Sequence, residues 1–475
     1  MEINKRAVRG SVVNPEGSIV FERLPEIQLY LEASNLKIKE GTFYQSAPER
    51  LKSIIDLSRK MDEAYMLGLS KFLANNGLKL SPVVMLSILS DRKFSFKDHS
   101  LSYIFNTPQR IAEAVGMESL GFLHLNNSFK KNILKRALEN MNEFTLRKNR
   151  MERKKIKLKD LIKLLRPKPK DKTISELYKA IIESSKTAKL KDKDTLVSAK
   201  SSKAMSADDK KKYFTENIEK IPLNQLVRNL AFLEMNFDFS EGNKLKEKII
   251  KRLNSVDSLR FLNLFDLIEA CIHVPQMEKA LFEVLKKHVY KFKKEFDYIG
   301  DTTILFDFSG SMNGDGFERG FKYLILFSIL NDNINLRAFS NGLFDEKFKH
   351  VLTQLKVGLI SDAHEQLNKF FNSHSSGTAL LDSVKELMDE DENITSMIVI
   401  SDEVSWLEGS DLRDEISEVS DLMKGTKLIL INPVVYKGTV FKDNVLGISA
   451  LTSSVMFDVM AFENPNKFID FIRKY

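Results

Sequence analysis

The sequence lacks the features that mark secreted and membrane-spanning proteins. It contains one cysteine, Cys271, among 475 residues, so it forms no internal disulfide and fits a reducing compartment. No run of about 18 apolar residues could span a bilayer, and the first residues lack the apolar core of a secretion signal. We therefore expect a cytoplasmic protein without a membrane partner, in which Cys271 is a small buried residue on a helix.

Catalytic signatures are also missing. The seven histidines are dispersed, and there is no His-Glu-x-x-His pair, no serine or cysteine nucleophile motif and no glycine-rich phosphate loop. A metal-dependent nuclease built on Asp307 and Asp402 is conceivable, but two-metal sites need more carboxylates close together. We therefore expect a protein that is not an enzyme.

The charge of the chain is divided unevenly. The net charge is +8, but residues 301–475 carry 16 basic against 27 acidic side chains, which leaves 57 basic against 38 acidic in residues 1–300. Residues 121–170 alone hold 16 basic and 4 acidic side chains, a net of +12. A local basic excess of this kind is typical of a surface that binds a polyanion.

The first 300 residues read as helices joined by short connections. We expect an N-terminal arm over residues 1–23 and a helical domain over residues 24–295, organised as an α-solenoid of HEAT-like helix pairs. An irregular all-α domain is the alternative. Lys186 to Lys212 is rich in Lys, Ser, Asp and Ala, which predicts a mobile excursion that buries little.

From residue 300 to residue 475 short apolar runs alternate with helical patterns. This alternation predicts a separate α/β domain with a doubly wound, mostly parallel sheet. The expected strands are Thr303–Phe308, Ile334–Phe339, Ser396–Ser401, Lys427–Asn432 and Ser454–Val459. The expected helices include Phe317–Leu330, Thr378–Met388, Leu412–Met423 and Pro465–Lys474.

A possible metal site lies at the end of the first of these strands. Asp307, Ser309 and Ser311 follow the pattern Asp-x-Ser-x-Ser, and three oxygen-bearing side chains at a strand end can converge on a hard cation. Thr378 opens a later helix and Asp402 ends a later strand, so both can add oxygens. This set suits octahedral Mg²⁺, with Mn²⁺ as the alternative. A chance turn or a metal-free relic would show the same short pattern.

The basic stretch predicts a surface for nucleic acid. Its first cations fall at helical spacing opposite apolar residues, which gives one helix a basic face over an apolar one. A solvated helical face is the alternative, although such faces normally mix both signs. The candidate RNA-binding residues are Lys130, Lys131, Lys135, Arg136, Arg147, Lys148, Arg150, Arg153, Lys154, Lys155, Arg166 and Lys168.

The metal pattern resembles a known site. Asp307, Ser309, Ser311, Thr378 and Asp402 match the five positions of the metal-ion-dependent adhesion site of a von Willebrand factor A domain. The resemblance covers roughly residues 301–475. It implies a metal that serves recognition by accepting a carboxylate from a partner.

The order of the parts resembles a larger family. A helical region with Lys159 to Pro169 (KDLIKLLRPKP), then Ile221 to Leu230 (IPLNQLVRNL), then an A domain with a complete metal motif, is similar to the TROVE-module proteins of the Ro autoantigen family. The resemblance spans roughly residues 24–475. It implies HEAT-like repeats closed into a ring by the A domain. It also implies binding of small structured noncoding Y RNAs and of single-stranded 3′ ends of misfolded RNAs.

This resemblance carries further expectations. Bacterial relatives tether an exoribonuclease, polynucleotide phosphorylase, through such an RNA, and the family implies no DNA specificity. Many relatives carry a His where this chain has Arg166, which puts base-specific contact at that position in doubt. The segment Lys186 to Lys212 is unlike animal members and favours a bacterial or bacteriophage type. The competing hypothesis is a metal-dependent adaptor that captures an acidic partner protein.

Overall fold

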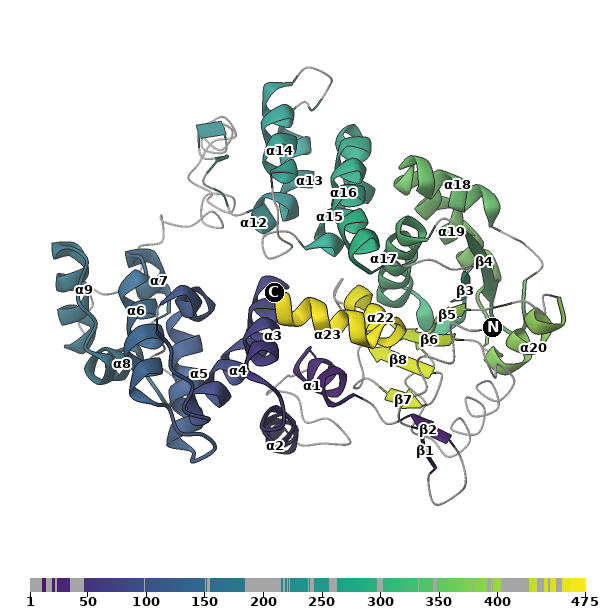
Figure 1. Cartoon of the computed structure of the whole chain (residues 1–475). Coiled ribbons are helices and arrows are strands. Elements are labelled where there is room, and N and C mark those ends of the chain that lie inside the picture. Colours follow the sequence, from purple (N-terminus) through teal and green to yellow (C-terminus); the bar gives the residue numbers. More distant parts are fainter. Residues whose placement is uncertain are drawn as a thin grey trace. The chain divides into compact units, whose positions relative to one another are not determined.

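The computed structural model shows two compact units (Figure 1). The helical unit comprises Gln28–Asn217 and Ile469–Tyr475, and the mixed unit comprises Met1–Ile27 and Ile218–Phe468. The predicted division at residues 295–300 stays a prediction. The structure describes residues 11–13, 19–21, 24–34, 47–97, 99–149, 151, 154–183, 215–216, 218–219, 221, 223–237, 239, 243–255, 263–296, 302–331, 333–344, 348–377, 379–390, 394, 396–402, 427–433, 440–442, 445–449 and 455–475.

The helical unit is a succession of short helices, as the sequence predicts. Within the described residues, no helix of the chain is long and apolar enough to cross a bilayer. The elements are α1 (Pro25–Ser34, which begins in the mixed unit), α2 (Ala47–Ser58), α3 (Glu63–Asn75), α4 (Ser81–Asp91), η2 (Ser100–Phe105), α5 (Pro108–Ser119), η3 (Phe129–Lys135), α6 (Arg136–Asn140), α7 (Glu143–Lys148), α8 (Leu158–Leu165) and α9 (Lys172–Ile182).

The last residues of the chain pack inside the helical unit. The ring of Phe72 on α3 lies 5.5 Å from the ring of Tyr475, and the Tyr475 hydroxyl accepts a hydrogen bond from Asn75 at 2.8 Å. An ion pair of 2.9 Å joins Arg473 to Asp62, which also caps α3. The C-terminal end of α23 (Pro465–Lys474) therefore completes the core of a unit whose other residues lie about 250 positions or more earlier in the chain.

The mixed unit combines helices with a sheet. Cys271 is fully buried on α15, as expected of a small apolar residue, and burial raises the pKa of its thiol. Glu278 accepts hydrogen bonds from the backbone N–H (2.6 Å) and hydroxyl (2.9 Å) of Ser361, which ties these helices to the α/β part. The helices are α12 (Leu223–Arg228), α13 (Leu230–Asn236), α14 (Lys244–Asn254), α15 (Leu264–His273) and α16 (Glu278–Phe296).

The sheet has six strands, five of them parallel. Its order is β4-β3-β5-β6-β8-β7, and β7 pairs with β8 in the antiparallel direction. The chain leaves β3 for a neighbour on one side and returns to a neighbour on the other, so it changes winding direction there. The strands are β3 (Thr302–Asp307), β4 (Ile334–Phe339), β5 (Ser396–Ile400), β6 (Lys427–Asn432), β7 (Val440–Lys442) and β8 (Val445–Ser449). A separate hairpin joins β1 (Ser11–Val13) and β2 (Ile19–Phe21).

Helices cover both faces of the sheet. Leu305 of β3 belongs to a buried cluster with α20 (Leu380–Glu390), and the next residue, Phe306, faces α17 (Asp315–Leu330). A Cβ added to Gly320 would lie 2.8 Å from the Phe306 ring, so glycine lets α17 approach the sheet closely. This alternation explains why the central strands are apolar on both sides. Two further helices, α18 (Lys349–Val357) and α19 (Ile360–His374), follow β4.

One predicted strand is wrong. The run Ser454–Val459 falls on α22 (Val455–Glu463), whose residues 456–461 are all buried. The run has only six residues, and Asp458 interrupts its apolar side chains, so it shows no period that separates a buried helix from a buried strand. The predicted helix Leu412–Met423 and the predicted excursion Lys186–Lys212 lie outside the described residues.

Candidate nucleic-acid surface and candidate metal centre

The first candidate cations lie on a π-helix. The segment η3 carries Lys130, Lys131 and Lys135, while Phe129 and Ile133 of the same segment are buried. A π-helix of seven residues is unusual, because π-turns mostly occur singly inside α-helices, and they are frequent at functional sites. The apolar side fixes this segment in the core and leaves its lysines at the surface.

Two of these candidates have acidic partners. The Lys130 ammonium lies 2.9 Å from a carboxylate oxygen of Glu118, and Arg136 lies 2.9 Å from Glu139. No ion pair is present for Lys131 or Lys135 among the described residues. The unpaired lysines are therefore the stronger candidates for an anionic ligand.

Glu139 organises the surface and was not predicted from the sequence. It is buried, and its second oxygen accepts the backbone N–H of Lys168 at 2.8 Å. One carboxylate thus joins α6 to the loop after α8. Burial, and secondarily the charge of Glu139, raise the pKa of Tyr178 to about 12. The sequence shows Glu139 only as one of four acidic residues in the basic run of residues 121–170, and nothing in it marks this role.

The following candidates lie on α7 and just after it. Arg147 is paired with Glu143 at 2.7 Å, and the Lys148 ammonium lies 5.6 Å from the centre of the Phe144 ring. Such a cation over a ring is only weakly stabilised at an exposed position. Arg150 and Arg153 lie outside the described residues, so their assignment stays a prediction.

The remaining candidates surround α8. Lys154 and Lys155 are exposed before this helix, whose apolar side is buried. Arg166 ends it in the left-handed conformation, at φ 47°, with its side chain exposed. Lys168 is exposed as well. Because α8 packs against both η3 and α5, the described candidates lie on neighbouring elements of one unit.

The candidate metal centre is a chain of hydrogen bonds at the ends of β3 and β5. The backbone N–H of Ser309 donates to Asp307 at 2.7 Å, and the hydroxyl of Ser401 donates to the other oxygen of Asp307. The hydroxyls of Ser309 and Ser311 lie 3.0 Å apart, and Ser311 donates to Asp402 at 2.9 Å. The structure therefore brings together four of the five predicted ligands.

Neighbouring segments hold this cluster in place. Gly310 donates its backbone N–H to the carbonyl of Ser376 at 2.8 Å, and Asn432 at the end of β6 donates to the carbonyl of Asp402 at 3.0 Å. The segment around Ser376 therefore lies beside the predicted ligands of β3. Thr378, the fifth predicted ligand, lies outside the described residues.

The electrostatics of the cluster favour a cation. Burial raises the pKa of Asp307 to about 7, the hydrogen bonds from Ser401 and Ser309 oppose this shift, and the charge of Asp402 adds to it. Burial also raises the pKa of Asp402. Two carboxylates and two hydroxyls fit the oxygen preference of Mg²⁺, which would compensate the buried charge. Among the described residues, no group of three or more Asp, Glu, His or Cys side chains forms a metal site.

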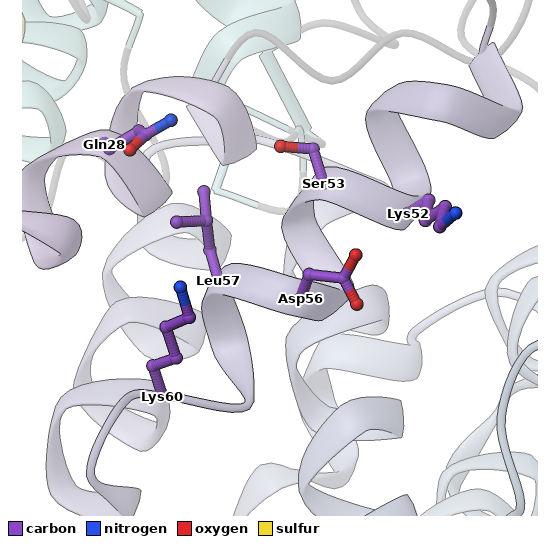
Figure 2. Close-up of a pocket in the computed structure, with 6 residues that line it drawn as sticks. All are labelled: Gln28, Lys52, Ser53, Asp56, Leu57 and Lys60. Carbon is purple, nitrogen blue, oxygen red and sulfur yellow. The ribbon is translucent and has the colours of Figure 1, made fainter.

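A shallow pocket lies elsewhere, between α1 and α2 (Figure 2). Its volume is about 370 Å³, and none of the predicted site residues lines it. The lining residues are Gln28, Lys52, Ser53, Asp56, Leu57 and Lys60.

Comparison with known proteins gives a structural likeness. No family model and no curated protein matches the sequence. The structure is similar to the crystal structure of the Ro (RSR) protein of Deinococcus radiodurans, with a TM-score of 0.53 and 13% sequence identity. The match covers 95% of this chain and 100% of that protein. The chain therefore has the fold of a bacterial Ro protein over nearly its whole length.

Proposed function

We propose that this chain is a non-catalytic RNA-binding scaffold whose helical unit carries the RNA surface. The observation that carries the proposal is a set of surface cations with no acidic partner among the described residues, all on or beside η3 and α8. They include Lys131, Lys135, Lys154, Lys155, Lys163 and Lys168. Unpaired cations this close together repel one another, and a polyanion relieves that repulsion.

The expected binding energy comes largely from phosphate contacts. Each neutralised phosphate of a duplex releases counterions, with a slope of about −0.9 in log K against log salt. Six contacts would therefore give a slope of about −5. Such a dependence separates phosphate recognition from binding driven by apolar burial.

The RNA class is inferred from the resemblance to the Ro family, with which the fold likeness agrees. We propose that the ligands are small structured noncoding RNAs and single-stranded 3′ ends of misfolded RNAs, and that the protein acts in RNA quality control in the cytoplasm. An exoribonuclease such as polynucleotide phosphorylase is the proposed protein partner. The HEAT-like ring closed by an A domain belongs to the same proposal.

The metal centre is proposed to bind Mg²⁺ through Asp307, Ser309, Ser311, Thr378 and Asp402. When bound, the ion would supply a coordination position for an anionic ligand. The chain's own residues would orient it: Ser401 and the Ser309 N–H fix the Asp307 carboxylate, and Asn432 fixes the backbone of Asp402. This centre would serve recognition without cleaving the RNA.

The test compares two charge-matched double variants. Lys131→Gln with Lys135→Gln removes two unpaired cations of η3, and Lys349→Gln with Lys385→Gln removes two lysines from the α/β part. Filter binding to a structured RNA should weaken several-fold in the first variant, and its salt slope should flatten by about two units. The second variant should bind like the wild type. Equal binding by all three proteins would refute this surface.

The second candidate function is a metal-dependent adaptor for an acidic partner protein. The hydrogen-bonded cluster around Asp307 favours it, because its oxygens can hold an ion that a partner carboxylate could complete. Asp307→Ala and EDTA should then each release the partner, while ribonuclease should not. Release by ribonuclease alone would instead favour an RNA bridge.

A further inference from the structure

Three α-helices of the helical unit end in the same way. At the end of α3, α4 and α5, a residue with positive φ is followed by a residue whose N–H reaches back five positions. The positive-φ residues are Gly77 (82°), Lys93 (64°) and Gly121 (75°). Glycine is the usual residue there because it has no Cβ to clash with the backbone. The middle helix uses a lysine instead.

Lys93 has a positive φ, which is unfavourable for a residue with a Cβ, and its side chain is exposed. Its helix end is fully formed, since its own N–H donates to Ser90 at 3.0 Å and the N–H of Phe94 donates to Leu89 at 3.0 Å. Glycine would make the same hydrogen bonds with less strain. What the lysine adds is a cationic side chain on a backbone that hydrogen bonds hold in place. Arg166 is likewise an exposed cation at a helix end with positive φ.

The end of α5 presents an aromatic ring to solvent. Phe122 follows Gly121 and is 38% exposed, and Leu120 before it is 60% exposed. Phe94, which holds the corresponding position after α4, packs its ring 4.9 Å from that of Phe96. The backbone of Phe122 is fixed by its hydrogen bond to Met117 at 3.0 Å. The exposed ring therefore sits on a rigid turn.

Hydrogen bonds bring this turn beside the end of α4. The N–H of His124 donates to Asp91 at 2.8 Å, and the side chain of Asn126 donates to the carbonyls of Ser90 (3.0 Å) and Phe94 (2.9 Å). His124 lies two positions after Phe122, and Lys93 lies two positions after Asp91. The ring and the lysine thus project from two paired segments.

A second set of hydrogen bonds joins the loop after α4 to the π-helix η3. Phe96 donates its N–H to Ser128 at 3.2 Å, and Asn132 donates to the carbonyl of Phe96. Lys97, the next residue, is exposed, as is Lys131 next to Asn132. Three exposed lysines, Lys93 and Lys97 after α4 and Lys131 on η3, therefore lie near the paired ends of α4 and α5. Among the described residues none of the three takes part in an ion pair.

We propose that the ends of α4 and α5 form a site for single-stranded RNA, in which an unpaired base stacks on Phe122 and Lys93, Lys97 and Lys131 hold the flanking phosphates. A single strand is favoured because bases in a duplex already stack on one another and cannot place a face on the ring. The lysines supply charge complementarity for RNA. This inference rests on the proposed RNA-binding function and extends it beyond residues 130–168.

The experiment uses the full chain and one hairpin RNA, prepared with and without an oligoadenylate 3′ tail. Phe122→Ala and Phe122→Leu should bind the tailed RNA about five- to 150-fold more weakly, the range expected for one lost stacking contact. Phe122→Trp should retain binding, and the tail-free RNA should not discriminate among the variants. Val357→Ala, at a 58% exposed apolar position on α18, is the control and should behave as wild type.

A spectroscopic signal separates stacking from general apolar contact. The chain has one tryptophan, Trp406, so Phe122→Trp in a Trp406→Phe background carries a single reporter. Its fluorescence should be quenched by the tailed RNA and unchanged by the hairpin alone. Lys93→Gln with Lys97→Gln should flatten the salt slope for the tailed RNA by about 1.4 units.

The outcomes distinguish this site from the proposed function. If wild-type protein binds RNA with a steep salt slope but Phe122→Ala and Phe122→Leu bind the tailed RNA equally well, the stacking site is refuted and the RNA function stands. If wild-type protein binds neither RNA, both fail. Loss of binding in Phe122→Leu with no quenching of the tryptophan reporter also refutes stacking, and would favour a role of Phe122 in packing or in a protein contact.

Discussion

The two candidate sites are built in opposite ways. The metal centre gathers buried oxygens at the ends of two neighbouring strands, and most of its ligands come from one five-residue motif. The candidate RNA surface spreads cations over η3, α6, α7 and the residues around α8. The first concentrates negative charge inside the protein, and the second distributes positive charge over a surface. Each should therefore respond to a different perturbation.

The largest expected effect is on the stability of the protein when no metal occupies the candidate metal centre. The raised pKa of Asp307, about 7 against 3.8, means that the folded state binds a proton more tightly than the unfolded state. Stability should therefore fall as pH rises from about 4 through 7, and the cost above pH 7 is on the order of 4 kcal/mol. In EDTA at pH 8, Asp307→Asn should unfold at a higher temperature than wild type, and the difference should shrink toward pH 5.

Adding Mg²⁺ should reverse the order of unfolding temperatures, so that wild type becomes more stable than Asp307→Asn. Mg²⁺ should raise the unfolding temperature of wild type and leave Asp307→Asn unchanged, because only the folded carboxylate binds it. Asp315→Asn, the same change at an exposed residue of α17, is the control and should show neither effect. A wild type that is more stable than Asp307→Asn in EDTA at pH 8 would contradict this electrostatic account.

A smaller effect is expected at the acidic residue inside the basic surface. Glu139→Ala should lower the free energy of unfolding by about 2 kcal/mol, because a buried carboxylate that accepts bonds from Arg136 and the Lys168 N–H is lost. Glu143→Ala, which breaks the more exposed pair with Arg147, should cost less than about 1 kcal/mol. Denaturant unfolding measures both. Equal losses would mean that Glu139 does not organise this surface.

The two sites also differ in how far the sequence predicts them. The parallel strands β3 to β6 lie where their apolar runs predict, so Asp307, Ser309, Ser311 and Asp402 meet as expected from their places at strand ends. Their meeting is predictable from the sequence because neighbouring parallel strands bring their C-terminal ends to the same edge of the sheet. The strand predicted at Ser454–Val459 is instead part of the helix α22, because six mostly apolar residues show no period that separates the two.

For the candidate RNA surface, the sequence predicts only a local excess of basic residues. A run of cations shows net charge, but whether a given lysine is free depends on acids that the fold brings to it. Glu118 reaches Lys130 from another helix, and the αL conformation of Lys93 becomes visible only in three dimensions. Lys97 lies 33 residues before Lys130. It lies beside η3 because Phe96 forms hydrogen bonds with Ser128 and Asn132, and the local sequence does not predict these bonds.

The smallest predicted effect compares two adjacent lysines. Lys131→Gln should weaken RNA binding about fivefold, whereas Lys130→Gln should have less effect because Glu118 already neutralises that charge. Glu118→Gln should release Lys130 and tighten binding slightly. Filter binding at one fixed salt concentration measures all three. A larger loss for Lys130→Gln than for Lys131→Gln would show that the ion pair does not set the availability of the cation.

The most direct test of RNA binding is a salt titration of wild-type protein with a structured RNA that carries a single-stranded 3′ tail, with and without Mg²⁺. The account predicts a slope of log K against log salt of about −5, tighter binding than for the blunt RNA, and little response to the metal. A slope near zero with no preference for the tail would contradict an RNA surface on the helical unit and favour the metal-dependent adaptor, and RNA binding that disappears in EDTA would place the RNA at the metal centre instead.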